Sequence, residues 1–562
     1  MALELAITGG SLIDGTGATA RRADVGIQAG RIVSIGTDLG PAERTIAASG
    51  LAVAPGFIDI HTHYDAQILW DRMLTISPWH GVTTVVMGNC GFGVAPTRPA
   101  HRGIILRTLE KVEGMSLECL QAGVGTDWPF ETFPQYLDAV ERSGSVINVA
   151  ALLGHTPLRL YVLGEEATER TATPNEVATM RRLVREAIDA GALGFATSKS
   201  PTHVGFAGKP VPSRAADLDE ITALVGVLGE AKRGVMQATV GPGFFFDEFA
   251  ALARATHVPI TWTALLAGML GPGSHRMLLA RSLELTHEGL PIVPQVACRP
   301  LNFEFDMQEP FVLESLPVFH AVSAADRAGK IRLYRDAAFR RGFIDTVESE
   351  MAGPFPGMVR RTVISYAPHA PALEGRNLVA VAQERGVHPV EALLDIALES
   401  DLVARFRAAV MNYDEDEVAE LLQNPYTVIG LSDAGAHASQ LCDACFSTHL
   451  LGHWVREKRV LGLEDAVRML TARPAEVMGI SDRGRLATGL AADVVVFDPA
   501  TVGASPLRRV HDLPAGAPRL VSDATGIEAL VVNGKLVRQH GRDVVDAKGP
   551  LPGRVLRGGR AA

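Results

Sequence analysis

Eight short apolar runs of β-type composition recur through the middle of the chain, and this recurrence constrains the fold more than any other feature. Several runs are separated by helical stretches, for example NEVATMRRLVREAIDAG before the fourth and DLDEITALVGVLGEAKRG before the fifth. In these stretches apolar residues recur at intervals of three and four, and Gly ends each helix. The predicted strands span residues 51–60, 82–88, 146–154, 192–198, 234–240, 258–266, 290–297 and 426–432.

Strands that alternate with helices indicate parallel βαβ units, and eight such strands predict a closed (β/α)₈ TIM barrel. A ninth run, at 362–368, is one more than this barrel needs. We place it in an insertion of about 299–425, after the seventh strand, although the strand pattern alone does not force this placement.

The two ends of the chain are rich in β-type residues. LAITGGSLID and ADVGIQAGRIVSIG open the chain, and ADVVVFDP and IEALVVNGKLVRQHGRDV lie near its end. Asn533-Gly534 between two such runs is a strong hairpin signal. We expect one small β-sandwich domain built from 1–54 and 485–562, with the barrel spanning 55–484. The alternative is two unrelated hairpins.

Composition excludes several classes of protein. The 562 residues are 47% hydrophobic and 21% charged, with a net charge of −10 and five cysteines. Without a concentrated basic face a nucleic-acid partner is not expected, and an odd, small number of cysteines favours a reducing compartment. The N-terminus lacks signal-peptide character, and no apolar run reaches the roughly 18 residues of a membrane span. We expect a soluble cytoplasmic protein; the oligomeric state, a homo-oligomer included, stays open.

His61-Thr62-His63 directly follows the first predicted barrel strand. Residues i and i+2 of an extended chain point the same way, so both imidazoles can face one metal ion at the C-terminal end of the strand. Two histidines in a polar loop are the alternative reading of His-x-His alone.

Asp433, in GLSDAGAH, ends the last predicted strand. Closure of the barrel would bring it beside the first strand, where a carboxylate can touch a metal ion and accept a proton from water as a general base. A helix N-cap is its alternative role.

Cys90 lies in VVMGNCGFG, after the second predicted strand. Its thiolate could bind a metal ion, since the glycines on either side permit close approach of the backbone. The alternative is an inert buried thiol.

These strings together resemble a known enzyme family. PGFIDIHTHYD resembles the first-strand motif of the amidohydrolase superfamily, and with GNCGFG, GHTPLR and LSDAGAH it is similar to the N-acyl-D-amino acid deacylase (D-aminoacylase) branch. The resemblance extends from ITGGSLIDG to RGRLATGLAADVVVFDP. It implies a zinc-dependent hydrolase of a small-molecule amide, in which Cys90 binds or bridges zinc and does the work of the carboxylated lysine of hydantoinases.

The chain departs from that branch in three places. The branch carries zinc-binding histidines at the ends of the fifth and sixth strands, whereas GVMQATVGPG and PITWTALLAG contain none. His61, His63, Cys90 and Asp433 are the donors that remain, which implies one Zn²⁺. The branch also has an arginine-containing string after the last strand, and CDACFSTHLLGHW lacks it, which weakens the transfer of the acyl-amino-acid substrate.

Three further residues are candidates for substrate binding. His155, in GHTPLR, is expected to orient substrate or water, or to make a structural hydrogen bond. Lys199, just past the fourth strand, stands where hydantoinase-like relatives keep a carboxylated lysine, or is a solvated loop residue. His203, four residues on, could reach the metal or the substrate, or be a loop histidine.

Two alternatives to a deacylase-like enzyme stay open. One is a cyclic-amide hydrolase of the hydantoinase or dihydropyrimidinase type that uses Lys199. The other is a degenerate, metal-free barrel that serves as a binding or scaffold protein. The loss of two histidines favours the scaffold, whereas four donors on three strands favour the enzyme.

A separate prediction concerns the insertion. Phe303, Phe305 and Phe311 form an apolar wall over the site, or else simply pack the insertion onto the barrel.

Overall fold

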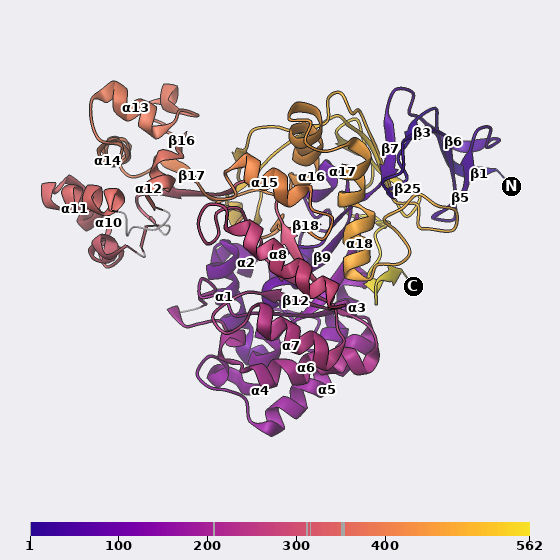
Figure 1. The fold of residues 1–562 in the computed structure, drawn as a ribbon, viewed down its shortest axis with the longest axis horizontal. Coiled ribbons are helices and arrows are strands. Elements are labelled where there is room, and N and C mark those ends of the chain that lie inside the picture. The colour runs from indigo at the N-terminus through magenta and orange to yellow at the C-terminus, as the bar shows by residue number, and fades with distance from the viewer. Residues whose placement is uncertain (1, 206–207, 311–312, 315, 350–354, 562) are drawn as a thin grey trace.

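A parallel sheet of eight strands, arranged in sequence order, forms the centre of the fold (Figure 1). The computed structural model describes residues 2–205, 208–310, 313–314, 316–349 and 355–561. The predicted eight parallel strands are confirmed as β8 (Phe57–Asp59), β9 (Val82–Met87), β10 (Asn148–Gly154), β11 (Gly194–Ser198), β12 (Val235–Thr239), β13 (Ile260–Thr263), β14 (Ile292–Val296) and β18 (Val428–Ile429).

Hydrogen bonds also join the segments that follow the first and last of these strands. Thr62 and Ala434 form a parallel bridge. The N–H of His63 donates to the Ala434 carbonyl at 2.8 Å, and the N–H of Asp433 donates to the His61 carbonyl at 3.1 Å. The C-terminal ends of β8 and β18 are therefore neighbours, and the groups that follow them share one edge.

The run 51–60, predicted as one strand, is two strands in different sheets. β7 (Ala52–Pro55) pairs with strands from the end of the chain, and β8 begins the parallel sheet. Gly56 separates them where the backbone passes close to β9, since a Cβ at Gly56 would lie 2.2 Å from Cγ2 of Thr83. The single-strand prediction was wrong because an unbroken apolar run does not show where its hydrogen-bonding partner changes.

Amphipathic helices connect the strands and pack against one another around the sheet. They include α5 (Pro174–Ala190), α6 (Leu218–Ala231), α7 (Phe246–Thr256) and α8 (Ser274–His287). α5 begins with a capping box in which the N–H of Thr173 donates to Oε2 of Glu176 at 2.7 Å, and it ends at Gly191 with φ of 106°. The predicted helices before the fourth and fifth strands are confirmed.

The insertion between β14 and β18 forms a separate unit (Figure 1). Its antiparallel sheet has the order β15 (Leu301–Asp306), β17 (Arg405–Met411), β16 (Thr362–Tyr366), so the ninth run lies outside the parallel sheet. Its helices include α10 (Arg327–Arg335), α11 (Ala337–Glu348), α13 (Leu378–Arg385) and α14 (Pro389–Glu399). These elements bury an apolar core of their own, which is distinct from the core around the parallel sheet.

Strands from both ends of the chain pair within one seven-stranded sheet. β7 lies antiparallel to β19 (Val494–Phe497), with Pro55 opposite Val494. A hairpin joins β24 (Ile527–Val532) to β25 (Lys535–Gln539), and its turn residues Asn533 and Gly534 have φ of 45° and 76°, as predicted for Asn-Gly. A four-stranded sheet of β5 (Arg31–Gly36), β4 (Asp24–Gln28), β1 (Leu3–Thr8) and β6 (Ala42–Ala47) shares an apolar core with it.

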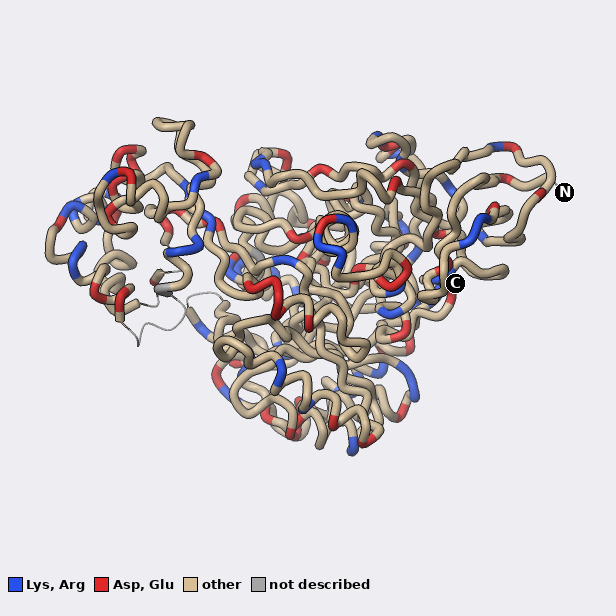
Figure 2. Tube along the Cα trace, turned by 45° about the horizontal axis from the view of Figure 1, so that its top comes forward, with Lys and Arg blue, Asp and Glu red and all other residues tan. Residues whose placement is uncertain are grey.

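Charge is dispersed over the molecule. Figure 2 shows Lys and Arg interspersed with Asp and Glu over the described part of the chain. Among the described residues, no helix combines the length and the apolar character needed to cross a membrane.

Candidate metal centre

Two histidines project from the extended segment after β8. His61 is 0% exposed and His63 is 6% exposed, and their ring centroids lie 5.3 Å apart. Thr62 between them bridges to the segment after β18, so the backbone here is held as an extra piece of strand. This explains why residues i and i+2 present their rings on the same side.

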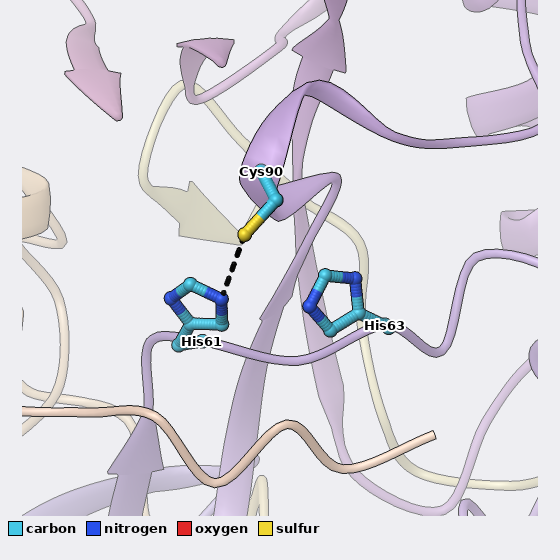
Figure 3. Close-up of side chains that lie close together, drawn as sticks. All are labelled: His61, His63 and Cys90. Carbon is cyan, nitrogen blue, oxygen red and sulfur yellow. Dashed lines mark hydrogen bonds between the residues drawn. The ribbon is translucent and has the colours of Figure 1, made fainter. Parts of the chain in front are cut away.

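Cys90 approaches the histidines from the turn after β9 (Figure 3). Its Sγ lies 3.4 Å from Nε2 of His61. Cys90 has a φ of 56°, between Gly88 and Gly91 with φ of 84° and 73°. A Cβ at Gly88 would lie 2.2 Å from the Leu152 carbonyl oxygen, so the turn is pressed against β10 and requires glycine there.

The three ligand atoms of His61, His63 and Cys90 lie within 4.8 Å of one another, and all three residues are buried. Burial raises the pKa of the Cys90 thiol, but the neighbouring His61 and His63 outweigh this and lower it to about 6. The lowered pKa favours the thiolate, which is the form that binds metals. Two imidazoles and a thiolate fit a divalent metal ion.

Asp433 reaches the same place from the segment after β18. Its Oδ1 lies 3.3 Å from Nε2 of His61 and 3.6 Å from Nε2 of His63. Burial acts to raise the pKa of Asp433, but the hydrogen bond from His63 and the charges of both histidines hold it below its usual range. The side chain keeps 20% exposure, so an ionised carboxylate faces both the metal ligands and an open side.

Two buried glutamines contact the candidate ligands, and no motif in the sequence points to either of them. Gln295 of β14 accepts a 2.7 Å hydrogen bond from Nδ1 of His61. Gln237 of β12 accepts one of the same length from the backbone N–H of Cys90. The available sequence signal was a single glutamine inside each of two otherwise apolar strands, GVMQATV and PIVPQVA. A buried amide at such a position needs a hydrogen-bond partner.

A sequence model of the amidohydrolase family matches residues 44–538, which is most of the chain. The chain belongs to the amidohydrolase family. It is 30% identical over 549 residues to a D-aminoacylase of Alcaligenes xylosoxydans xylosoxydans, with 96% of this chain and 95% of that protein covered.

Solved structures agree with this assignment. A crystal structure of N-acyl-D-glutamate deacylase from Bordetella bronchiseptica, complexed with zinc and a phosphonate inhibitor, has a TM-score of 0.68 at 29% identity, covering 99% of this chain and 100% of that one. A D-hydantoinase structure has a TM-score of 0.52 at 14% identity and covers 99% of both chains, a likeness that shows the fold alone. The predicted resemblance to the deacylase branch is confirmed, and the hydantoinases are more distant.

The fifth and sixth strands of this amidohydrolase end in hydroxyl groups where the deacylase branch was expected to have histidines. Thr263, the last residue of β13, donates from Oγ1 to Oγ1 of Thr239, the last residue of β12, at 3.2 Å. Thr263 also accepts a hydrogen bond from Nε2 of Gln237 at 3.3 Å. Uncharged hydroxyls and amides bind divalent zinc much more weakly than imidazole, so these strands offer no second set of strong ligands.

His155 lies at the start of α4 (His155–Leu163), and both of its ring nitrogens have protein partners. Nδ1 lies 2.8 Å from Oγ1 of Thr197, and Nε2 lies 2.8 Å from Oε1 of Glu220, which also pairs with Arg159. Burial lowers the pKa of His155 despite the carboxylate beside it. These contacts agree with the alternative that His155 makes structural hydrogen bonds. Substrate binding by His155 stays a prediction.

Lys199 is also engaged by the protein. Its Nζ donates to the carbonyl oxygen of Arg214 at 2.7 Å and to that of Ala216. Burial lowers the pKa of Lys199, but the ammonium group still has two carbonyl acceptors. A carboxylated lysine would present oxygens to those same carbonyls, which is repulsive, so the observed contacts suit an unmodified side chain.

His203 lies beside the metal centre. Its Nδ1 is 2.7 Å from Oγ of Ser198, and its ring lies 5.0 Å from that of Phe92, which in turn is 6.2 Å from the ring of His63. Burial lowers the pKa of His203 to about 3, with a further contribution from the charge of His63. A neutral imidazole therefore lines this side of the site.

Phe303 of the insertion contacts His437, whereas Phe305 belongs to the core of the insertion. The ring of Phe303 meets that of His437 edge-on at 6.1 Å, and the charge of His437 contributes to the lowered pKa of Asp433. Phe305 is 2% exposed and lies 5.9 Å from the ring of Phe406 inside the insertion. The prediction that Phe305 forms part of an apolar wall over the site is therefore wrong. Phe311 lies outside the described residues.

A cavity of about 390 Å³ lies at the opposite end of the parallel sheet from these residues. It is bordered by the starts of β11 to β14, for example Leu193, Val235 and Ile260, and by Arg473. Because the candidate metal ligands follow the C-terminal ends of the strands, this cavity is not part of the candidate metal centre.

Proposed function

We propose that this amidohydrolase is a zinc-dependent enzyme that hydrolyses the amide bond of a small N-acyl-D-amino acid-like substrate. The observation that carries the proposal is the convergence of His61, His63, Cys90 and Asp433 from three separate strand ends. The proposal includes a (β/α)₈ barrel over 55–484 and a β-sandwich domain built from 1–54 and 485–562.

His61, His63, Cys90 and Asp433 would hold the ion. Zinc at such a site supplies Lewis acidity and favours ionisation of water near pH 7. A single zinc is proposed, because Thr239 and Thr263 stand where two further strong ligands would be needed.

Asp433 acts as the general base. Its low pKa keeps it ionised at neutral pH, and its 20% exposure leaves the carboxylate accessible from the open side of the site. It would take a proton from the attacking water and deliver it to the leaving nitrogen, so that the amide yields a carboxylic acid and a free amine. His203 and Phe303 line the surroundings in which substrate is held.

The substrate class is supported by the relatives. The protein of 30% identity acts as a D-aminoacylase, and the structure of TM-score 0.68 is an N-acyl-D-glutamate deacylase. The cyclic-amide alternative depends on Lys199, whose Nζ is instead bonded to two carbonyl oxygens. A metal-free scaffold has no physical need for a low-pKa thiolate beside two buried histidines.

The test is hydrolysis by the zinc-loaded protein of N-acetyl-D-amino acids, their L-enantiomers, hydantoin and dihydrouracil, measured by release of amine or ring-opened product. We expect turnover of at least one N-acyl-D-amino acid that is lost on removal of zinc with a chelator. Turnover of the cyclic amides alone would overturn the deacylase proposal. Turnover of no amide, together with absence of bound zinc, would support the scaffold.

A further inference from the structure

Four polar side chains of the parallel sheet are buried beneath the candidate metal centre. Gln237, Thr261 and Gln295 are 0% exposed and Thr263 is 3% exposed, and they come from β12, β13 and β14. Burying an amide or a hydroxyl costs free energy unless its hydrogen bonds are made, so two amides and two hydroxyls need a reason to be here. Their contacts connect them to the metal ligands.

Gln295 determines which nitrogen of His61 carries the proton. Its Oε1 lies 2.7 Å from Nδ1 of His61, and an amide oxygen only accepts hydrogen bonds, so Nδ1 is the donor. In a neutral imidazole this leaves the lone pair on Nε2. Nε2 is the atom that lies 3.4 Å from Sγ of Cys90 and 3.3 Å from Oδ1 of Asp433, where a metal ion would be bound.

The Gln295 amide has a defined position from two sides. Its Nε2 donates to Oγ1 of Thr261 at 3.2 Å. On the opposite side lies Gly430, where an added Cβ would be 3.1 Å from Oε1 of Gln295 and 3.3 Å from Cγ1 of Ile60. The absence of a side chain at Gly430 therefore leaves the room that the amide occupies.

Gln237 contacts the backbone of Cys90, as Gln295 contacts the ring of His61. Its Oε1 accepts the backbone N–H of Cys90 at 2.7 Å, and its Nε2 donates to Oγ1 of Thr263 at 3.3 Å. Cys90 has a positive φ, which is unfavourable for a residue with a side chain, so this hydrogen bond helps to hold the turn.

We propose that Gln295 and Gln237 are positioning residues for the metal centre: Gln295 fixes the tautomer and orientation of His61, and Gln237 fixes the turn that presents Cys90. This inference rests on the proposed metal site and deepens it. β12, which lacks the expected histidine, and β14 contribute indirectly, by orienting the donors that remain.

The experiment compares zinc affinity among variants at the Gln295 position. Metal-free wild type, Gln295→Leu and Gln295→Glu are titrated with zinc in competition with a chromophoric chelator. Loss of an outer hydrogen-bond partner typically weakens metal binding about 10–100-fold, and we expect that increase in Kd for Gln295→Leu. A carboxylate also accepts from Nδ1, so Gln295→Glu should restore an affinity close to that of wild type.

A second readout and a control separate positioning from general damage. Cobalt(II) titration should show a thiolate-to-metal absorption band in wild type and in Gln295→Glu, but a weakened or shifted band in Gln237→Leu. Asn148→Leu removes a buried amide from the start of β10, at the other end of the sheet. It should lower the midpoint of thermal unfolding without changing the Kd for zinc.

The outcomes distinguish this inference from the proposed function. If wild type binds zinc and Gln295→Leu binds it equally well, the positioning role is wrong while the metal site stands. If Gln295→Leu is too unstable to purify, equal zinc affinity of wild type and Gln295→Glu supports the inference, and a tenfold weaker Gln295→Glu contradicts it. If wild type itself binds no zinc, the proposed function fails.

Discussion

Oδ1 of Asp433 lies 3.3 Å from Nε2 of His61, although one residue follows the last strand of the parallel sheet and the other follows the first. The bridge between Thr62 and Ala434 makes this approach possible, because it holds the two strand ends side by side. A carboxylate with a lowered pKa is thereby placed next to the two buried histidines proposed to bind the metal.

Asp433→Asn should destroy turnover and leave the fold intact. Removing a general base typically costs on the order of 10²–10⁴-fold in kcat. The midpoint of thermal unfolding should stay close to that of wild type. A variant with near wild-type kcat would show that another group accepts the proton.

Cys90 should titrate as an acidic thiol in the metal-free protein. Because the pKa is lowered to about 6, the thiolate persists as the pH falls and is lost only as the pH passes below that value. The measurement is ultraviolet thiolate absorbance against pH, taken as the difference between wild type and Cys90→Ser. A midpoint near the ordinary thiol value of about 8.5 would contradict the electrostatic account.

Much of the fold could be predicted from local patterns. Short apolar runs, helix caps and the Asn533-Gly534 turn each depend on residues that are neighbours in the sequence. The alternation of these runs with helices was enough to predict the eight parallel strands. The supporting roles of Gln237 and Gln295 could not be predicted, because each depends on a partner from a distant strand. The contact of His155 with Glu220 on α6 was hidden for the same reason.

Phe303 and Phe305 provide a matched pair in the insertion. Phe303→Ala should raise KM or change acyl-chain preference with little loss of stability, because its ring contacts His437 at the site. Phe305→Ala should lower the free energy of unfolding by about 3–5 kcal/mol and leave substrate preference unchanged, because its ring is buried in the insertion core. Equal effects of both substitutions on preference would contradict this division.

Lys199→Met tests the cyclic-amide alternative. Nζ donates to two backbone carbonyls, so its loss should lower stability by on the order of 1.5–3 kcal/mol while zinc content stays unchanged. The exposed Lys232→Met serves as the control, with stability and zinc content both expected to match wild type. Loss of zinc in Lys199→Met alone would show that this lysine takes part in the metal site.

Zinc stoichiometry is the most direct test of the central claim, that His61, His63, Cys90 and Asp433 form a single metal centre. Elemental analysis of the purified protein should give about one zinc per chain, since the fifth and sixth strands offer no further strong ligands. The double substitution His61→Ala with His63→Ala should abolish binding, whereas the exposed His287→Ala should not change it. Full zinc occupancy in the double variant would contradict the account.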